Sequence, residues 1–155
     1  MLMKGRKGYA VLQRRARMTG VAGLMVCFTL FAVAQTSETF TARLTMMPID
    51  RVMQPNVTGS GSGAARLDGE RLFVNGSFSA MHGPATVARV HQGLAMGVRG
   101  AALFELSVVA SVEGTFSGEG ELTGEQVESL RAGKLYIQIH SEAAPEGNLW
   151  GWLLN

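Results

Sequence analysis

The sequence predicts an all-β domain: a Greek-key-like antiparallel β-sandwich with one short helix, preceded by an N-terminal signal peptide. Short segments such as 40–46 alternate apolar and polar residues, which is the pattern of a strand with one buried face. Glycine-containing turn signals, such as Asp68-Gly69, separate these segments. A single segment, after Thr123, has helical spacing. Many short strands with one helix favour a sandwich or a barrel over an α/β enzyme fold.

The first 34 residues have the composition of a secretory signal peptide. They carry six basic residues and no acidic one, then the apolar run 21–33, and they end in Ala-Val-Ala. The run is shorter than the roughly 20 residues that a membrane-spanning helix needs. We therefore expect cleavage after Ala34 and a mature domain over 35–155 in the periplasm or secreted from a bacterial cell, with no membrane span. An uncleaved anchor and a start at Met18 stay open as alternatives.

Removal of this leader reverses the charge of the chain. Eight of the 14 Lys and Arg residues fall after residue 34, together with all twelve Asp and Glu residues, so the mature part has a net charge of −4. A nucleic-acid partner needs a clustered basic surface, and the sequence contains no such cluster. The one cysteine, Cys27, lies in the leader, so the mature domain must be held together by its core.

The strand assignments follow the alternation. In the segment 134–141, Leu135, Ile137 and Ile139 share one face, which we expect to be core. The last strand is apolar on both faces, so it should be covered on both sides, with Trp152 in the core. We expect a bulge at 75–76, where Asn-Gly interrupts a strand. The segment 48–61 is interpreted as a loop, and strands are predicted at 39–46, 64–67, 71–79, 86–91, 101–109, 114–121, 134–141 and 148–154.

The helix is predicted over about 124–132 by its start and stop signals. Thr123 and Gln126 match a capping box, in which each side chain bonds the other residue's backbone N–H. Val127 and Leu130 are three residues apart on one face, and Gly133 suits the C-terminal stop. This is a helix of about two turns.

Catalytic chemistry has little support in the sequence. It contains no Gly-x-Ser-x-Gly elbow, and the mature part has no cysteine. The glycine run 59–63 is not followed by Gly-Lys-Ser/Thr, so it is interpreted as a flexible loop rather than a phosphate loop. Glu119 and Glu121 are interpreted as a solvated strand face. We therefore predict a protein that is not an enzyme, with no catalytic residues, no cofactor and no cofactor-binding residues.

Two histidines at strand ends form the candidate functional or structural motif. His91 and His140 could converge and, with Glu142 or Glu146, bind zinc or copper. The alternative is that each imidazole bridges backbone groups and holds the domain closed. Because no His-x-His pair occurs, we predict no metal ligands and keep metal binding through His91 and His140 as the alternative function. The full motif is His91, His140, Tyr136, Arg89 and Glu142.

Several motifs together carry a family resemblance. The run 130–153 (LRAGKLYIQIHSEAAPEGNLWGWL), the opening strand 39–44, His91-Gln-Gly93 and the segment 120–123 resemble CHRD (chordin-type) domains. Arg89 stands where family members often have a first histidine, and 148–151 reads Asn-Leu-Trp-Gly in place of Glu-Ile-Arg-Gly. The resemblance implies a non-catalytic extracytoplasmic binding or structural module. Its partner is expected to be a protein or a cell-envelope ligand, and its oligomeric state is left open.

Overall fold

The computed structural model describes residues 37–47, 51–52 and 54–155, so the expected export signal lies outside the described residues. The described chain is mostly β-structure with one α-helix, α1 (Gly124–Arg131), and a 3-10 turn, η1 (Gln54–Asn56). The strands are β1 (Glu38–Met46), β2 (Ser60–Asp68), β3 (Arg71–Ser79), β4 (Ala85–Gly93), β5 (Gly100–Val108), β6 (Gly114–Glu121), β7 (Leu135–Ser141) and β8 (Leu149–Trp152).

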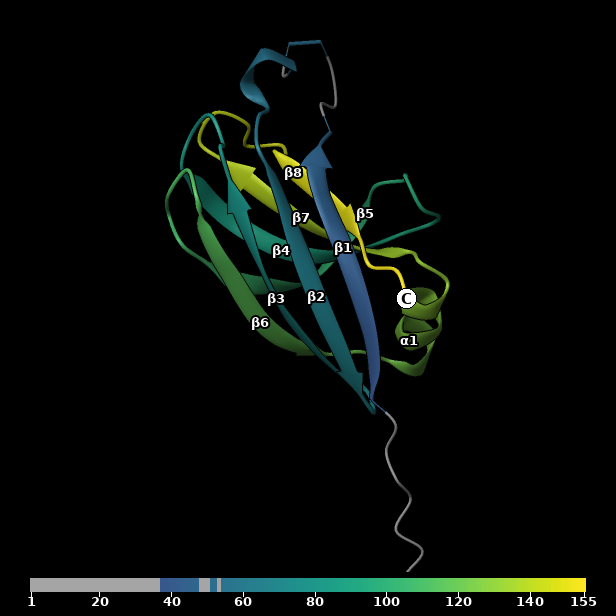
Figure 1. Cartoon of the computed structure of the whole chain (residues 1–155). Coiled ribbons are helices and arrows are strands. Elements are labelled where there is room, and N and C mark those ends of the chain that lie inside the picture. Colours follow the sequence, from purple (N-terminus) through teal and green to yellow (C-terminus); the bar gives the residue numbers. More distant parts are fainter. Residues whose placement is uncertain (1–36, 48–50, 53) are drawn as a thin grey trace, which may run out of the picture. The chain divides into compact units, whose positions relative to one another are not determined.

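The strands form a closed antiparallel barrel in the order β1-β2-β3-β6-β5-β4-β7-β8. Strand β7 returns to pair with β4 after the β4-β5-β6 meander, which is the Greek-key connection that the sequence predicts. Figure 1 shows β1, β2, β3 and β6 side by side, with β4, β7 and β8 behind them.

The expectation of a β-sandwich needs correction, because the two layers are hydrogen-bonded to each other along both sides and the sheet closes into a barrel. Strands β5 and β6 pair through Ser107↔Ser117 and Val108↔Phe116. Strands β1 and β8 pair through Thr45↔Trp150 and Met46↔Leu149. Alternation of buried and exposed residues is the same in a sandwich and in a barrel, so the sequence pattern could not distinguish them.

The inward residues of all eight strands form one core. Leu135, Ile137 and Ile139 are fully buried, as predicted from their shared face. In β8, Leu149 and Trp150 are buried on opposite faces, which agrees with the expected two-sided cover. Trp152 is only half-buried, so its placement in the core was wrong.

Helix α1 begins with the predicted capping box. The Thr123 hydroxyl accepts a hydrogen bond from the Gln126 backbone N–H (3.3 Å), and the Gln126 side chain accepts one from the Thr123 N–H (2.8 Å). Val127 and Leu130 belong to the barrel core. The Arg131 guanidinium bonds the Glu38 carboxylate of β1 (2.6 Å). The helix is therefore fixed to the barrel by apolar packing and by an ion pair.

Two predictions about glycine were wrong. The run 59–63 is not a flexible loop, because Ser60 begins β2. No bulge occurs at 75–76, since β2 and β3 pair without a shift through Gly63↔Gly76. Both glycines face inward, where a Cβ on Gly63 would lie 2.7 Å from Cδ1 of Ile137 and one on Gly76 would collide with the Phe116 ring. Glycine is needed there so that a large side chain can pack against the backbone.

Within the described residues, no helix has both the length and the apolar character required to cross a membrane.

Candidate functional site

The outer face of β4 and β7 brings four of the predicted site residues together. These strands are neighbours, with His91 opposite Tyr136, Arg89 opposite Gln138, and Val87 opposite His140. The residues that alternate with them, such as Val90 and Ile137, point into the barrel. His91, Tyr136, Arg89 and His140 therefore lie on one surface outside the core, whereas Glu142 lies in the loop after β7.

Aromatic rings are stacked on this outer face. Tyr136 is sandwiched between His91 (ring centroids 5.0 Å apart, planes 15° apart) and Trp150 (5.2 Å, 10°). Trp152 packs against Tyr136 in a tilted arrangement at 4.4 Å. The Arg99 guanidinium lies 5.5 Å from the Trp150 ring. Because Tyr136 and Trp150 are only 1% and 2% exposed, this cluster is a second, smaller core outside the barrel.

Both imidazoles are held by backbone carbonyls. His91 Nδ1 lies 3.1 Å from the Gly100 oxygen, and His140 Nδ1 lies 2.8 Å from the Pro145 oxygen. A carbonyl only accepts, so each Nδ1 carries the proton and each neutral ring presents a bare Nε2. Both Nε2 atoms are buried and have no hydrogen-bond partner among the described residues.

Burial lowers the pKa of both imidazoles, because it disfavours the charged form. The backbone hydrogen bonds oppose this effect in part. The positive charges of Arg89 and Arg99 lower both pKa values further, and His140 also lowers that of His91. The two rings are therefore close enough to influence each other, and both are neutral at pH 7.

The carboxylates do not complete a metal site with these rings. Glu142 is exposed and forms no ion pair within the described residues. Glu105 pairs with Arg89 (3.1 Å), and Glu146 pairs with Arg99 (3.7 Å). Among the described residues, no three His, Cys, Asp or Glu side chains are grouped as metal ligands would be.

Sequence reasoning missed two polar residues of this cluster. The Gln138 amide donates to the Glu146 carbonyl (2.8 Å), and the Asn148 amide donates to the Thr58 carbonyl (2.7 Å). Asn148 Oδ1 and Trp150 Nε1 are buried without a partner among the described residues. Gln138 is two residues from Tyr136 in β7, so the strand pattern alone places both side chains on the same face. The role of Asn148 could not be predicted, because its partner Thr58 lies 90 residues away along the chain.

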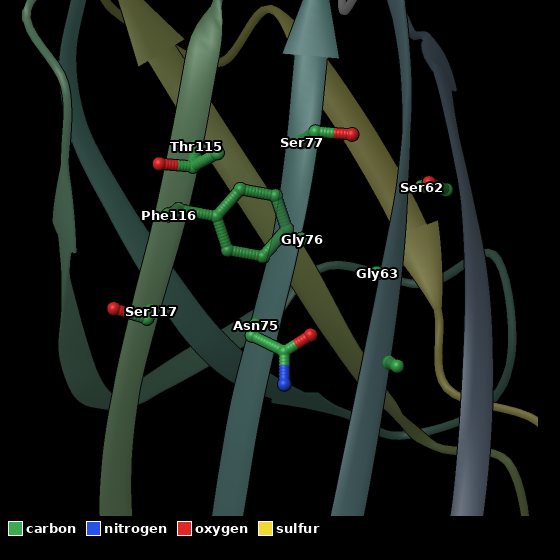
Figure 2. Close-up of a pocket in the computed structure, with 9 residues that line it drawn as sticks. Ser62, Gly63, Asn75, Gly76, Ser77, Thr115, Phe116 and Ser117 are labelled. Carbon is green, nitrogen blue, oxygen red and sulfur yellow. The ribbon is translucent and has the colours of Figure 1, made fainter.

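A groove on the opposite part of the barrel surface was also missed. It has a volume of about 490 Å³ and lies on β2, β3 and β6. Figure 2 shows the hydroxyl and amide side chains of these three strands, with the Phe116 ring reaching from β6 to Gly76. The available signal was that each of these strands has neighbouring outward residues that are small and mostly polar. The polar lining residues are Ser62, Asn75, Ser77, Thr115 and Ser117.

Comparison with models of known protein families shows which family this chain belongs to. The family model described as CHRD domain matches residues 40–153. The chain belongs to the CHRD domain family. The match runs from β1 to the residue after β8, so the aromatic cluster and the groove both lie within the CHRD domain. No curated protein and no solved structure matches the chain significantly.

Proposed function

We propose that this CHRD domain is a non-catalytic, extracytoplasmic binding module that is exported from a bacterial cell as residues 35–155. The observation that carries the proposal is the groove on β2, β3 and β6. A concave surface lined by hydrogen-bonding groups is what a binding protein presents to its ligand. Family membership supports an extracellular-type module, and the leader composition supports export.

The chemistry of the groove favours binding over catalysis. Of the described residues that line it, none is ionisable. General acid–base catalysis needs a titratable group near the reacting atoms, and a serine nucleophile needs an adjacent base. Ser62, Ser77 and Ser117 have no such base in the groove. Their hydroxyls can donate and accept hydrogen bonds, which is sufficient for recognition.

The proposal is tested by obstructing the groove. The full chain is expressed with its leader, purified from the extracytoplasmic fraction, and mixed with cell envelopes of the producing cells. We expect the wild type to sediment with the envelopes and the Ser77→Trp variant to stay in solution, because the indole fills the groove. Thr39→Trp, on an exposed position of β1 outside the groove, is the matched control and should sediment like wild type. Equal retention of Ser77→Trp would contradict the proposal.

A second candidate function is metal binding through His91 and His140. It is favoured by the two buried Nε2 atoms without partners. Metal-ligating imidazoles usually donate their other ring N–H to a carbonyl or carboxylate, and both Nδ1 atoms here lie on carbonyls. The two nearby arginines oppose it, since fixed positive charges repel a cation.

A further inference from the structure

We propose that the groove binds an uncharged glycan chain, an inference that rests on the proposed binding function and names its ligand class. The lining side chains are four hydroxyls, one carboxamide, one alanine methyl and one phenylalanine ring beside two glycines. A ligand for such a surface must be rich in hydrogen-bonding groups and must carry no net charge that the groove would leave unpaired.

The hydrogen-bonding groups of the groove are available and regularly placed. Ser62, Ser77 and Thr115 lie opposite one another on three adjacent strands, as do Ala64, Asn75 and Ser117. These two rows put polar groups about 4.8 Å apart across the strands. None of the five polar side chains has a hydrogen-bond partner within the described residues. Sugar hydroxyls, which also donate and accept, complement such an array.

Four charged residues beyond the Asn75 row are paired with one another, whereas Arg43 of β1, opposite Ser62, forms no ion pair among the described residues. Beyond the Asn75 row, the outward residues of β2 and β3 are Arg66 and Phe73, and the Arg66 guanidinium lies 4.4 Å from the Phe73 ring centroid. Arg66 also pairs with Asp68 (3.0 Å), and Arg71 pairs with Glu119 (3.3 Å). An anionic polymer needs several unpaired cations along its path, whereas the described lining residues include none and Arg43 is a single cation beside one end of the Ser62 row.

The shape of the groove suits a chain that lies across the sheet. Gly63 and Gly76 point inward, so the floor is bare backbone above the Phe116 ring, and the outward side chains on both sides are small. All lining residues come from one face of three neighbouring strands. An extended peptide, in contrast, pairs with the edge of a sheet and needs pockets for alternate side chains. The face of the sheet therefore favours a glycan over a peptide.

The test removes hydroxyls without blocking the groove. The purified, exported full chain carries Ser62→Ala, Ser77→Ala and Thr115→Val together, and its affinity for envelopes of the producing cells is compared with that of wild type. The matched control carries Thr39→Val, Thr41→Val and Thr45→Val, which remove three exposed hydroxyls of β1 outside the groove. We expect about tenfold weaker binding of the groove variant, because several hydrogen bonds are lost together, and unchanged binding of the control.

Treatment of the envelopes separates the ligand classes. Periodate cleaves the vicinal diols of sugars, so we expect it to abolish retention of the wild-type chain, whereas protease and lipid extraction should leave retention intact. Loss after protease but not after periodate would overturn the glycan while leaving the groove as a protein-binding site. Loss of retention on raising the salt concentration would indicate an anionic ligand and would also overturn it. If untreated envelopes retain no wild-type chain, the glycan and the proposed function both fall.

Discussion

The imidazole of His91 stacks on the phenol ring of Tyr136, with the ring centroids 5.0 Å apart and the planes 15° apart. Both residues also bond the same residue, Gly100. His91 Nδ1–H donates to the Gly100 carbonyl (3.1 Å), and the Tyr136 hydroxyl accepts from the Gly100 N–H (3.1 Å). Gly100 is the first residue of β5. The stacked pair therefore holds the start of β5 against the outer face of β4 and β7.

This arrangement predicts that stability falls as the pH is lowered. Burial lowers the folded-state pKa of His91 and His140 below the ordinary value of 6.5. The unfolded chain therefore takes up protons near pH 6.5, while the folded chain takes them up only at lower pH. The stability that the neutral rings provide is present above pH 6.5 and is lost as the pH falls through the folded pKa values. We expect Tm, measured by circular dichroism, to drop between about pH 7.5 and pH 5.

Histidine variants identify the source of this slope. His91→Gln combined with His140→Gln removes both titrating rings and should flatten the dependence of Tm on pH in this range. His82→Gln, which replaces an exposed imidazole, is the matched control and should keep the wild-type slope. Arg131 lowers the pKa of Glu38 from an ordinary value of 4.5. This carboxyl therefore takes up its proton below about pH 5 and does not contribute to the slope between about pH 7.5 and pH 5. An unchanged slope in the double variant would refute the assignment.

Gly76 should not tolerate even a methyl group. A Cβ there collides with the Phe116 ring and with the Ser62 backbone oxygen, and that backbone is fixed by pairing of β2 with β3. We expect Gly76→Ala to lower the free energy of unfolding by about 1–3 kcal/mol in urea titration. Gly124→Ala is the control, because nothing lies within 4 Å of its Cβ position. It should leave the free energy unchanged or raise it by up to about 1 kcal/mol. Equal effects of both substitutions would show that the collision is relieved without cost.

Local signals explain how much of the fold could be predicted. Alternation located every strand to within a few residues, and Thr123 with Gln126 located the helix, because these patterns depend on neighbours in sequence. The closure of the barrel depends on pairs such as Thr45↔Trp150 and Val108↔Phe116, which no local pattern records. The glycines were misinterpreted for the same reason. The sequence predicts a loop at Gly63 and a bulge at Gly76, and only Ile137 and Phe116, far along the chain, explain these two glycines.

The candidate site could be predicted only in part. Strand ends identified His91 and His140, and the barrel does bring their strands together. Glu142 was chosen because it is near His140 in sequence, yet the carboxylate that raises the pKa of His140 is that of Glu146. The groove was missed because its surface arises from three strands at once, and serine on a single strand has no special meaning. Whether outward side chains form a binding surface depends on which residues lie opposite them on the neighbouring strands.

Export is predicted to end with cleavage after Ala34, since Ala-Val-Ala follows an apolar run and an acid-free basic start. N-terminal sequencing and the intact mass of protein from the extracytoplasmic fraction should show a chain that begins at Gln35. Replacing Ala32 and Ala34 by leucine should block cleavage, because signal peptidases require small residues at those positions. Replacing Ala22 by leucine, within the apolar run, should leave cleavage intact. A full-length wild-type chain retained in the membrane would support an anchor instead.

Metal addition should not stabilise this CHRD domain at micromolar zinc or copper. A ligand that binds only the folded state raises Tm by mass action, so a metal site at His91 and His140 would show in a thermal melt. Arg89 and Arg99 lie close enough to lower the pKa of both imidazoles, and the same positive charge opposes a cation. We expect identical Tm values in zinc, in copper and in chelator. A rise in Tm that disappears in the variant His91→Ala with His140→Ala, but persists in His82→Ala, would contradict this prediction. It would show that the Nε2 atoms of His91 and His140 are metal ligands.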